Sequence, residues 1–123
     1  MAFRVEVEPQ ALEDLVAIAE HIKEHSFETA ERWFNGVMRA IWRLQESPSR
    51  CPVTSESEDL GQEVRLLLHG RRNQSYKIYF TIHHETPSTG TVRVLHVRHW
   101  ARRPLTGDEF ENLMNEPRGE DQE

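Results

Sequence analysis

The stretch FRVEVEPQALEDLVAIAEHI, residues 3–22, changes its hydrophobic period at Pro9. Before the proline, apolar and polar residues alternate strictly from Phe3 to Glu8, which is typical of a half-buried strand. After it, apolar residues recur with the spacing of one helix face, at Leu12, Leu15, Val16, Ala19 and Ile22. Proline suits the first turn of a helix because the N–H that it lacks would have no partner there. The stretch therefore predicts a strand that leads directly into a helix.

A second helix is expected a few residues further along the chain. Ser26 is a typical N-cap residue, and Pro48 stands just beyond the last residue of the apolar stripe that follows it. That stripe consists of Ala30, Trp33, Phe34, Val37, Met38, Ile41 and Leu44. Two amphipathic helices joined by so few residues form an αα-hairpin.

Three further strands are expected in the second half of the chain. Residues 47–62 are rich in Ser, Pro, Glu, Asp and Gly and indicate a loop. Strands are predicted from Val64 to His69, Tyr76 to His83 and Thr91 to His99, the last two pairing as a hairpin. The order β-α-α-β-β-β predicts an α+β fold, with the helical hairpin packed on a four-stranded antiparallel sheet. We assign this domain to residues 1–105, and a short helix with an acidic tail to residues 106–123.

Length and composition narrow the class of protein. The 123 residues suit one domain, and the single cysteine, Cys51, excludes an intrachain disulfide and a cysteine-based zinc site. No run approaches the roughly 20 apolar residues of a membrane span. The N-terminus has no apolar signal-like region either. We therefore expect a cytoplasmic protein that does not interact with membranes, and nothing in the sequence predicts a cofactor.

The net charge of −6 hides a strong asymmetry along the chain. Residues 1–64 hold 13 acids and 6 bases, and residues 65–103 hold 8 bases and a single acid. Residues 104–123 hold seven acids and one base, so the whole negative excess comes from this last segment. Such asymmetry indicates binding partners better than the mean charge does. The basic second half is the predicted functional face.

Several segments, in this order, resemble the RelE/ParE superfamily of toxins from bacterial type II toxin–antitoxin modules, some of which stabilise plasmids. They are ALEDLVAIAEHI with AERWFNGVMRAIWRLQESPSRCP, then EVRLLLHGRRNQSYKIYFTI, and last VRVLHVRHWARRPL. The resemblance covers residues 3–105 and implies a toxin that inhibits growth until a cognate antitoxin binds it. RelE-like members cleave mRNA on the ribosome, whereas ParE-like members bind DNA gyrase. Fold alone does not choose between these activities.

The resemblance places basic residues of functional interest in two strands. Arg65 stands where the family usually has a base, and its guanidinium suits a bidentate grip on phosphate or carboxylate. A salt bridge to a helix acid such as Glu20 or Glu31 is the alternative interpretation. Lys77 stands where RelE-like enzymes have a basic residue that stabilises charge on the phosphate. Its alternative is a solvated strand face, and for Tyr79 on the same face we expect packing.

The last strand and the basic turn after it supply the remaining candidates. In a ribonuclease, Arg98 would clamp the phosphate and His99 would act as the general acid or base, whereas we expect His96 to be a packed strand residue. Trp100, Arg102 and Arg103 suit contact with the antitoxin or the target. His83, His84, His96 and His99 could converge at the hairpin ends, but they lack any recognised zinc spacing, so we predict no metal site.

The sequence departs from the pattern of RelE-like ribonucleases in two places, and these departures decide between the two activities. The strand that holds Arg65 has one base, and no tyrosine follows His99 to donate a proton. We therefore predict a ParE-like, non-enzymatic toxin that acts on a protein target such as gyrase. The antitoxin or target would contact Arg65, Lys77, Arg98, Trp100, Arg102 and Arg103. The alternatives are a RelE-like mRNA endonuclease that uses Arg65, Lys77, Arg98 and His99, and a degenerate toxin that only binds antitoxin. Either a homodimer or a toxin–antitoxin hetero-oligomer fits the sequence.

Overall fold

The first half of the chain forms a strand and two helices, as its hydrophobic periods predict. The computed structural model describes residues 3–55, 57–70 and 75–99. Strand β1 (Phe3–Val7) leads into helix α1 (Pro9–Lys23), with the proline at the start of the helix. Helix α2 (Phe27–Trp42) begins after Ser26, whose side chain accepts a hydrogen bond from the Thr29 N–H at 3.1 Å. This bond satisfies one of the backbone donors that a helix start leaves without a partner.

The second half supplies three strands and several short helical turns. The connection from α2 contains η1 (Arg43–Gln45), η2 (Pro48–Arg50) and the four-residue helix α3 (Ser57–Leu60). Strands β2 (Arg65–His69), β3 (Tyr76–Thr86) and β4 (Thr89–His99) follow. β3 and β4 continue to a tight turn at residues 87–88, so their hairpin is longer than the sequence predicted. The predicted helix at residues 106–115 and the acidic tail lie outside the described residues.

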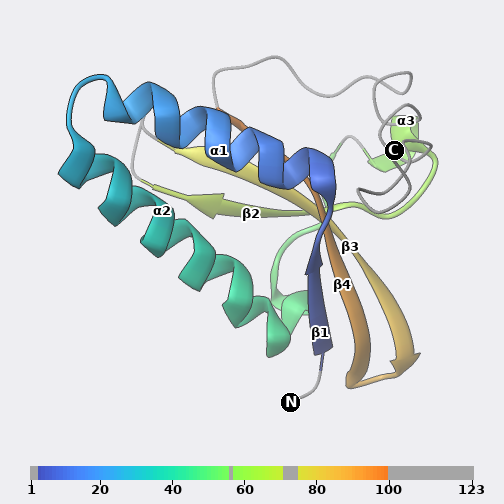
Figure 1. Cartoon of the computed structure of the whole chain (residues 1–123). Coiled ribbons are helices and arrows are strands. Elements are labelled where there is room, and N and C mark those ends of the chain that lie inside the picture. The colour runs from blue at the N-terminus through green and yellow to red at the C-terminus, as the bar shows by residue number, and fades with distance from the viewer. Residues whose placement is uncertain (1–2, 56, 71–74, 100–123) are drawn as a thin grey trace, which may run out of the picture.

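The four strands form one sheet in the order β1-β4-β3-β2 (Figure 1). β3 runs antiparallel to both β2 and β4, whereas β1 runs parallel to β4, with Phe3 beside Gly90 and Val7 beside Val94. The predicted α+β class is confirmed, but the sheet is mixed, and the prediction of a fully antiparallel sheet was wrong for the β1–β4 pair. Alternation along residues 3–8 indicates a half-buried strand but contains no information about its partner or its direction.

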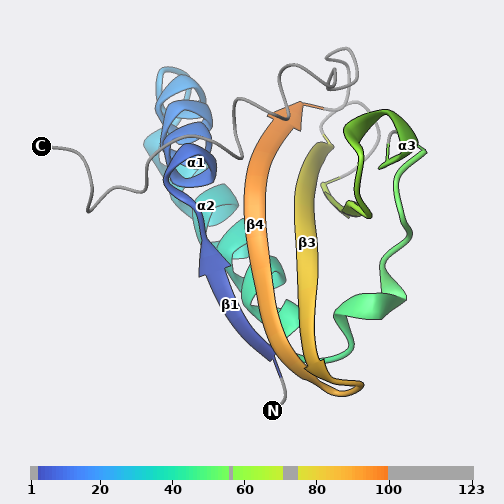
Figure 2. The same cartoon turned by 90° about the vertical axis from the view of Figure 1, so that its right-hand side faces the viewer.

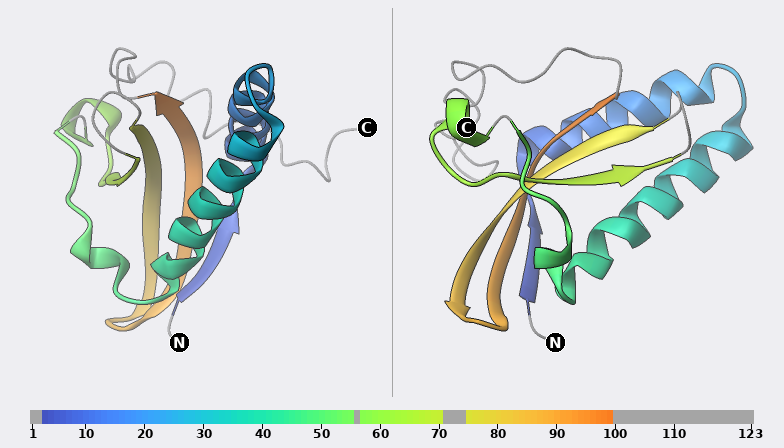
Figure 3. Two further views of the ribbon diagram at one scale, coloured as in Figure 1. Left: turned by 90° about the vertical axis from the view of Figure 1, so that its left-hand side faces the viewer. Right: turned by 180° about the vertical axis from the view of Figure 1, so that it is seen from behind.

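Apolar side chains pack on both faces of this sheet. Figure 2 shows α1 and α2 on one side of the β3–β4 hairpin and α3 on the other, and the views in Figure 3 agree. The larger cluster joins the helices to the sheet, and its fully buried members include Leu15, Val37, Ile41, Ile78, Phe80 and Val92. The smaller cluster contains Leu60, Val64, Tyr79 and Leu95. We refer to the helix face and the α3 face of the sheet below.

A bulge in β4 divides the residues of this strand between the two faces. Tyr79 pairs with His96 and Phe80 with Val94, so Leu95 is an extra residue in β4. Leu95 therefore joins the smaller cluster, and Val97 returns to the helix-face core. None of the described helices is both long enough and apolar enough to cross a membrane.

Candidate functional site

Two of the predicted cations lie beside each other on the α3 face. Lys77 of β3 is in register with Arg98 of β4 and with Leu68 of β2. Because neighbouring residues of a strand point to opposite faces, Lys77 lies opposite Ile78 of the helix-face core. Arg98 is only 6% exposed, whereas Leu68 is 60% exposed. We call these three residues the Leu68–Lys77–Arg98 row.

Arg65 fastens the loop that precedes its own strand. Its Nη1 donates hydrogen bonds to the carbonyl oxygens of Ser49 at 3.2 Å and Cys51 at 2.6 Å. Its Nη2 lies 3.5 Å from Oε1 of Glu63, and 17% of its side chain is exposed. Among the described residues its ion-pair partner is thus this nearby acid and not Glu20 or Glu31. The guanidinium is therefore committed to local structure. Because Arg65 is in register with Phe80 of the helix-face core, it lies on the face of the sheet opposite Lys77 and Arg98.

The two histidines near the end of β4 have different surroundings. Nδ1 of His96 contacts Oδ2 of Asp14 on α1, and its ring stacks on Tyr79, as expected for a packed histidine. The His99 ring meets the Tyr76 ring edge-on at 5.2 Å. Tyr76 packs against the helix-face core and contacts Trp33 of α2. His99 therefore lies on the face of the sheet opposite Lys77 and Arg98.

Asp14 is the residue of this region that the sequence did not reveal. Its Oδ2 also accepts a hydrogen bond from the Val97 N–H at 2.9 Å. With α1 it borders an open hollow of about 250 Å³ beside β4. The residues around this hollow are Asp14, Ala17, Ile18, His96, Val97, Arg98 and His99. An acid near the start of a helix is ordinarily explained by the helix dipole. The sequence around Asp14 therefore did not indicate that its carboxylate contacts residues about 80 positions further along the chain.

Burial sets the protonation of two side chains near these groups. It raises the pKa of Tyr76, so the hydroxyl stays protonated at neutral pH. It also raises the pKa of the Cys51 thiol, an effect that Arg50 and Arg65 partly oppose. Cys51 is therefore a neutral, buried thiol beside the carbonyl that Arg65 holds.

The two histidine pairs that could have formed a metal site, His83–His84 and His96–His99, lie far apart along the β3–β4 hairpin. His84 pairs with Gly90 near the hairpin turn, whereas His99 pairs with Tyr76 at the far end of the same two strands. Within residues 3–55, 57–70 and 75–99, no three His, Cys, Asp or Glu side chains are grouped as metal ligands would be. Of the other predicted contact residues, Trp100, Arg102 and Arg103 lie outside the described residues.

The topology, with two helices against a small mixed sheet and cations on the opposite face, defines the fold class of the small toxins that the sequence resembles. The family model for the ParE toxin of the type II toxin–antitoxin system parDE matches residues 5–104. The chain therefore belongs to the ParE toxin family.

Solved structures agree with this fold. One of them, from the chromosomal ParDE TA system of P. aeruginosa, superimposes with a TM-score of 0.61 at 19% sequence identity. The alignment covers 79% of this chain and 95% of that one. At this identity the likeness concerns the fold alone. Comparison with curated proteins gave no match.

Proposed function

We propose that this ParE-family protein is a cytoplasmic toxin that arrests growth by binding a protein target, DNA gyrase, and that a cognate antitoxin neutralises it. Family membership over residues 5–104 supports a toxin. The positions of the candidate catalytic groups support a binding role over a ribonuclease. General acid–base catalysis needs its proton donor within hydrogen-bond reach of the reacting phosphate, and the cations must surround the same phosphate. Arg98 and His99 both border the hollow beside α1, but His99 and Arg65 project from the helix face and Lys77 projects from the α3 face. The four groups therefore do not surround one phosphate, and the Arg65 guanidinium holds a loop.

The Leu68–Lys77–Arg98 row is the observation on which the proposed antitoxin contact rests. The exposed Leu68 beside Lys77 combines apolar area with positive charge, and the nearly buried Arg98 adds positive charge beneath them, which suits an amphipathic acidic segment of a partner protein. β2 is also the last strand of the sheet. The start of its outer edge is bonded to residues 52–54, through Leu66 N–H to the Pro52 carbonyl and the Val53–Arg65 bridge, so the part beyond Leu66 is the edge that can accept an added strand. We propose that the antitoxin covers this row together with Trp100, Arg102 and Arg103, and that it reaches Arg65 by passing around the β2 edge, because Arg65 lies on the helix face of the sheet.

A supercoiling assay with purified gyrase tests the proposed target. Saturating toxin should inhibit supercoiling and leave cleaved, protein-linked plasmid, and ribosome-bound mRNA should stay intact in cells after induction. Unchanged supercoiling at saturating toxin would refute the gyrase target. Cleaved transcripts that disappear in the variant Arg98→Ala/His99→Ala would instead establish the endonuclease. Harmless expression without antitoxin would indicate a degenerate toxin.

The variant Leu68→Glu tests the antitoxin surface. It places an acid beside Lys77 and should weaken antitoxin binding at least tenfold, because a desolvated interface contact is replaced by like-charge repulsion. Leu12→Glu is a matched control, since Leu12 is also an exposed leucine and lies on α1, away from the row and from Arg65. Equal antitoxin affinity of the two variants in calorimetric titrations would count against this surface.

A further inference from the structure

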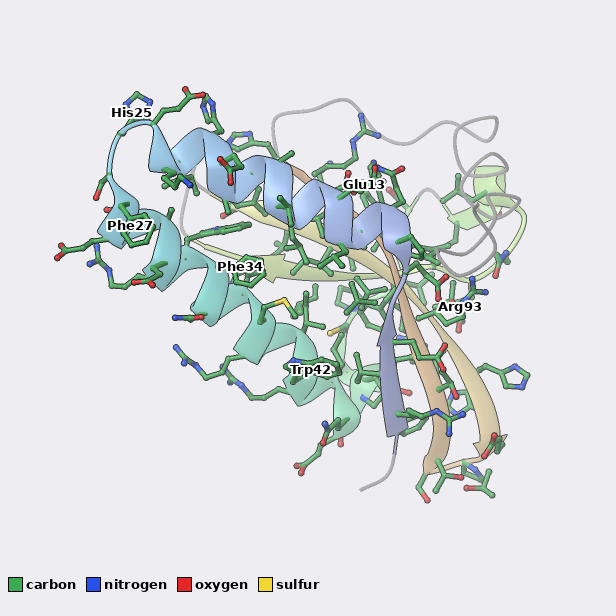
Figure 4. All side chains as sticks on the ribbon, viewed as in Figure 1. Glu13, His25, Phe27, Phe34, Trp42 and Arg93 are labelled. Atoms are coloured by element: carbon green, nitrogen blue, oxygen red, sulfur yellow. The ribbon has the colours of Figure 1, made fainter. Side chains whose placement is uncertain are left out.

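Three arginines and a tryptophan surround an open hollow at the C-terminal end of α2. The hollow has a volume of about 640 Å³ and is bordered by Arg39, Trp42, Arg43, Gln45, Glu46 and Arg50. Trp42 is 43% exposed, so its indole ring is accessible from the hollow. Figure 4 shows it at the end of α2 farthest from the turn that joins the two helices.

The arginines of this hollow have no acidic partners among the described residues. None of the three forms an ion pair there, and Nη1 of Arg50 makes only a weak contact with the Cys51 sulfur at 3.8 Å. Glu46 is the single acid at the rim, against three bases. The acidic average of residues 1–64 therefore conceals a local positive charge at this position.

Structural roles explain only part of the cluster. A cation in the last turn of α2 is stabilised by the helix dipole, which accounts for Arg39. The same effect does not account for Arg50, which belongs to η2, or for an exposed tryptophan between the cations. Trp42 gives the basic hollow an aromatic surface on which a base can stack, because the π-face of an indole accepts any nucleobase.

We propose that this hollow binds single-stranded nucleic acid, with Arg39, Arg43 and Arg50 on the phosphates and Trp42 stacked on a base. Arg39 and Arg43 are four residues apart, so they project from adjacent turns and can contact neighbouring phosphates. An acidic peptide would satisfy the arginines but would not use the indole face, which favours the nucleic acid. Such binding requires neither gyrase nor antitoxin, so it is tested on the purified full-length chain.

The test is the anisotropy of a labelled twelve-nucleotide oligo-dT titrated with the protein at several salt concentrations. Three phosphate contacts predict that the affinity falls about 100-fold for a tenfold rise in salt, since each contact on a single strand contributes a slope of about −0.7. Arg39→Gln/Arg43→Gln/Arg50→Gln should bind at least tenfold more weakly at low salt and should lose most of that slope. Arg32→Gln is the matched control, because Arg32 is an exposed arginine of the same helix outside the hollow.

The tryptophan distinguishes a nucleic acid from other anions. Trp42→Leu should weaken oligo-dT binding about fivefold or more, and Trp42→Phe should retain most of the affinity. Neither change should alter the binding of a twelve-residue oligoglutamate, which should be weaker than that of oligo-dT. Equal binding of oligoglutamate, full competition by millimolar inorganic phosphate, or an equal loss in Arg32→Gln would each overturn the proposal. Thermal unfolding of every variant confirms that the fold is intact, since the changed side chains lie at the surface.

Discussion

At the scale of single residues, Asp14 joins two elements that are distant in the sequence. β1 pairs with β4 only as far as Val94, and beyond this point the carboxylate of Asp14 accepts the Val97 N–H and contacts His96. A side chain of α1 thus replaces the strand partner that β4 lacks there. The contact explains why α1 lies along the end of β4 beyond β1.

The substitution Asp14→Ala should lower the free energy of unfolding by about 1–3 kcal/mol, because it leaves a part-buried N–H without an acceptor. Asp14→Asn should cost less, since the amide oxygen can still accept this bond. Urea unfolding measures both changes. Glu13→Ala, at the neighbouring exposed position, should stay within about 0.5 kcal/mol of the original chain. Equal losses for Asp14→Ala and Glu13→Ala would refute the bridging role.

His69 makes the stability depend on pH. Burial, reinforced by the positive charge of Arg43, lowers its pKa below the usual 6.5, so the folded state favours the neutral ring. Below pH 6.5 the unfolded chain binds more protons at this residue than the folded one, so stability falls as the pH falls through 6.5. His69→Gln should therefore lose less stability than the original chain between pH 7.5 and 5.5. His25→Gln, at the exposed turn between the helices (Figure 4), should follow the original chain in the same denaturant titrations.

At the scale of elements, the β3–β4 hairpin depends on Gly90. Its φ is +151°, and a Cβ there would lie 2.1 Å from the carbonyl oxygen of His83. Gly90→Ala should therefore destabilise the fold by about 1–3 kcal/mol or more, because backbone must move to relieve the clash. Gly61→Ala is a matched control: its φ is +80°, but its Cβ would meet nothing within 4 Å, so it should cost only about 1–2 kcal/mol. A smaller loss in Gly90→Ala than in Gly61→Ala, measured by thermal unfolding, would contradict this.

The elements that the sequence predicted correctly are those with a local signal. Pro9, the Ser26 cap and the apolar periods depend on residues a few positions apart, and the structure confirms both helices and the cap. The predicted face of α1 was wrong at Leu12 and Val16, which are exposed, because the helix turns Ala11 and Leu15 toward the core. The parallel β1–β4 pair and the Leu95 bulge depend on partners about 85 and 15 residues away, so no local pattern indicates them.

The same limit applies to the candidate site. Strand alternation placed Arg98 and His99 on opposite faces, but the loop contacts of Arg65 arise only once the chain is folded.

At the scale of the whole molecule, positive charge gathers in two places that the linear charge count does not separate. One is the Leu68–Lys77–Arg98 row on the α3 face, and the other is the arginine hollow at the end of α2 on the helix side. The second lies in the half of the chain whose average is acidic. Folding therefore brings together cations that the sequence disperses among acids, and a single net charge of −6 describes neither surface.

The acidic residues 104–123 should weaken the binding of any polyanion through long-range repulsion. Glu109→Gln/Glu111→Gln/Glu116→Gln removes three negative charges and should raise the oligo-dT affinity severalfold at 10 mM salt, where the Debye length is about 30 Å. At 150 mM the gain should nearly vanish, because screening then acts within about 8 Å. Glu13→Gln/Glu20→Gln/Glu24→Gln removes the same charge from α1 and the residue that caps its C-terminal end, and should give a gain of similar size. A gain confined to the tail variant and persisting at 150 mM would show instead that the tail occupies a basic surface directly.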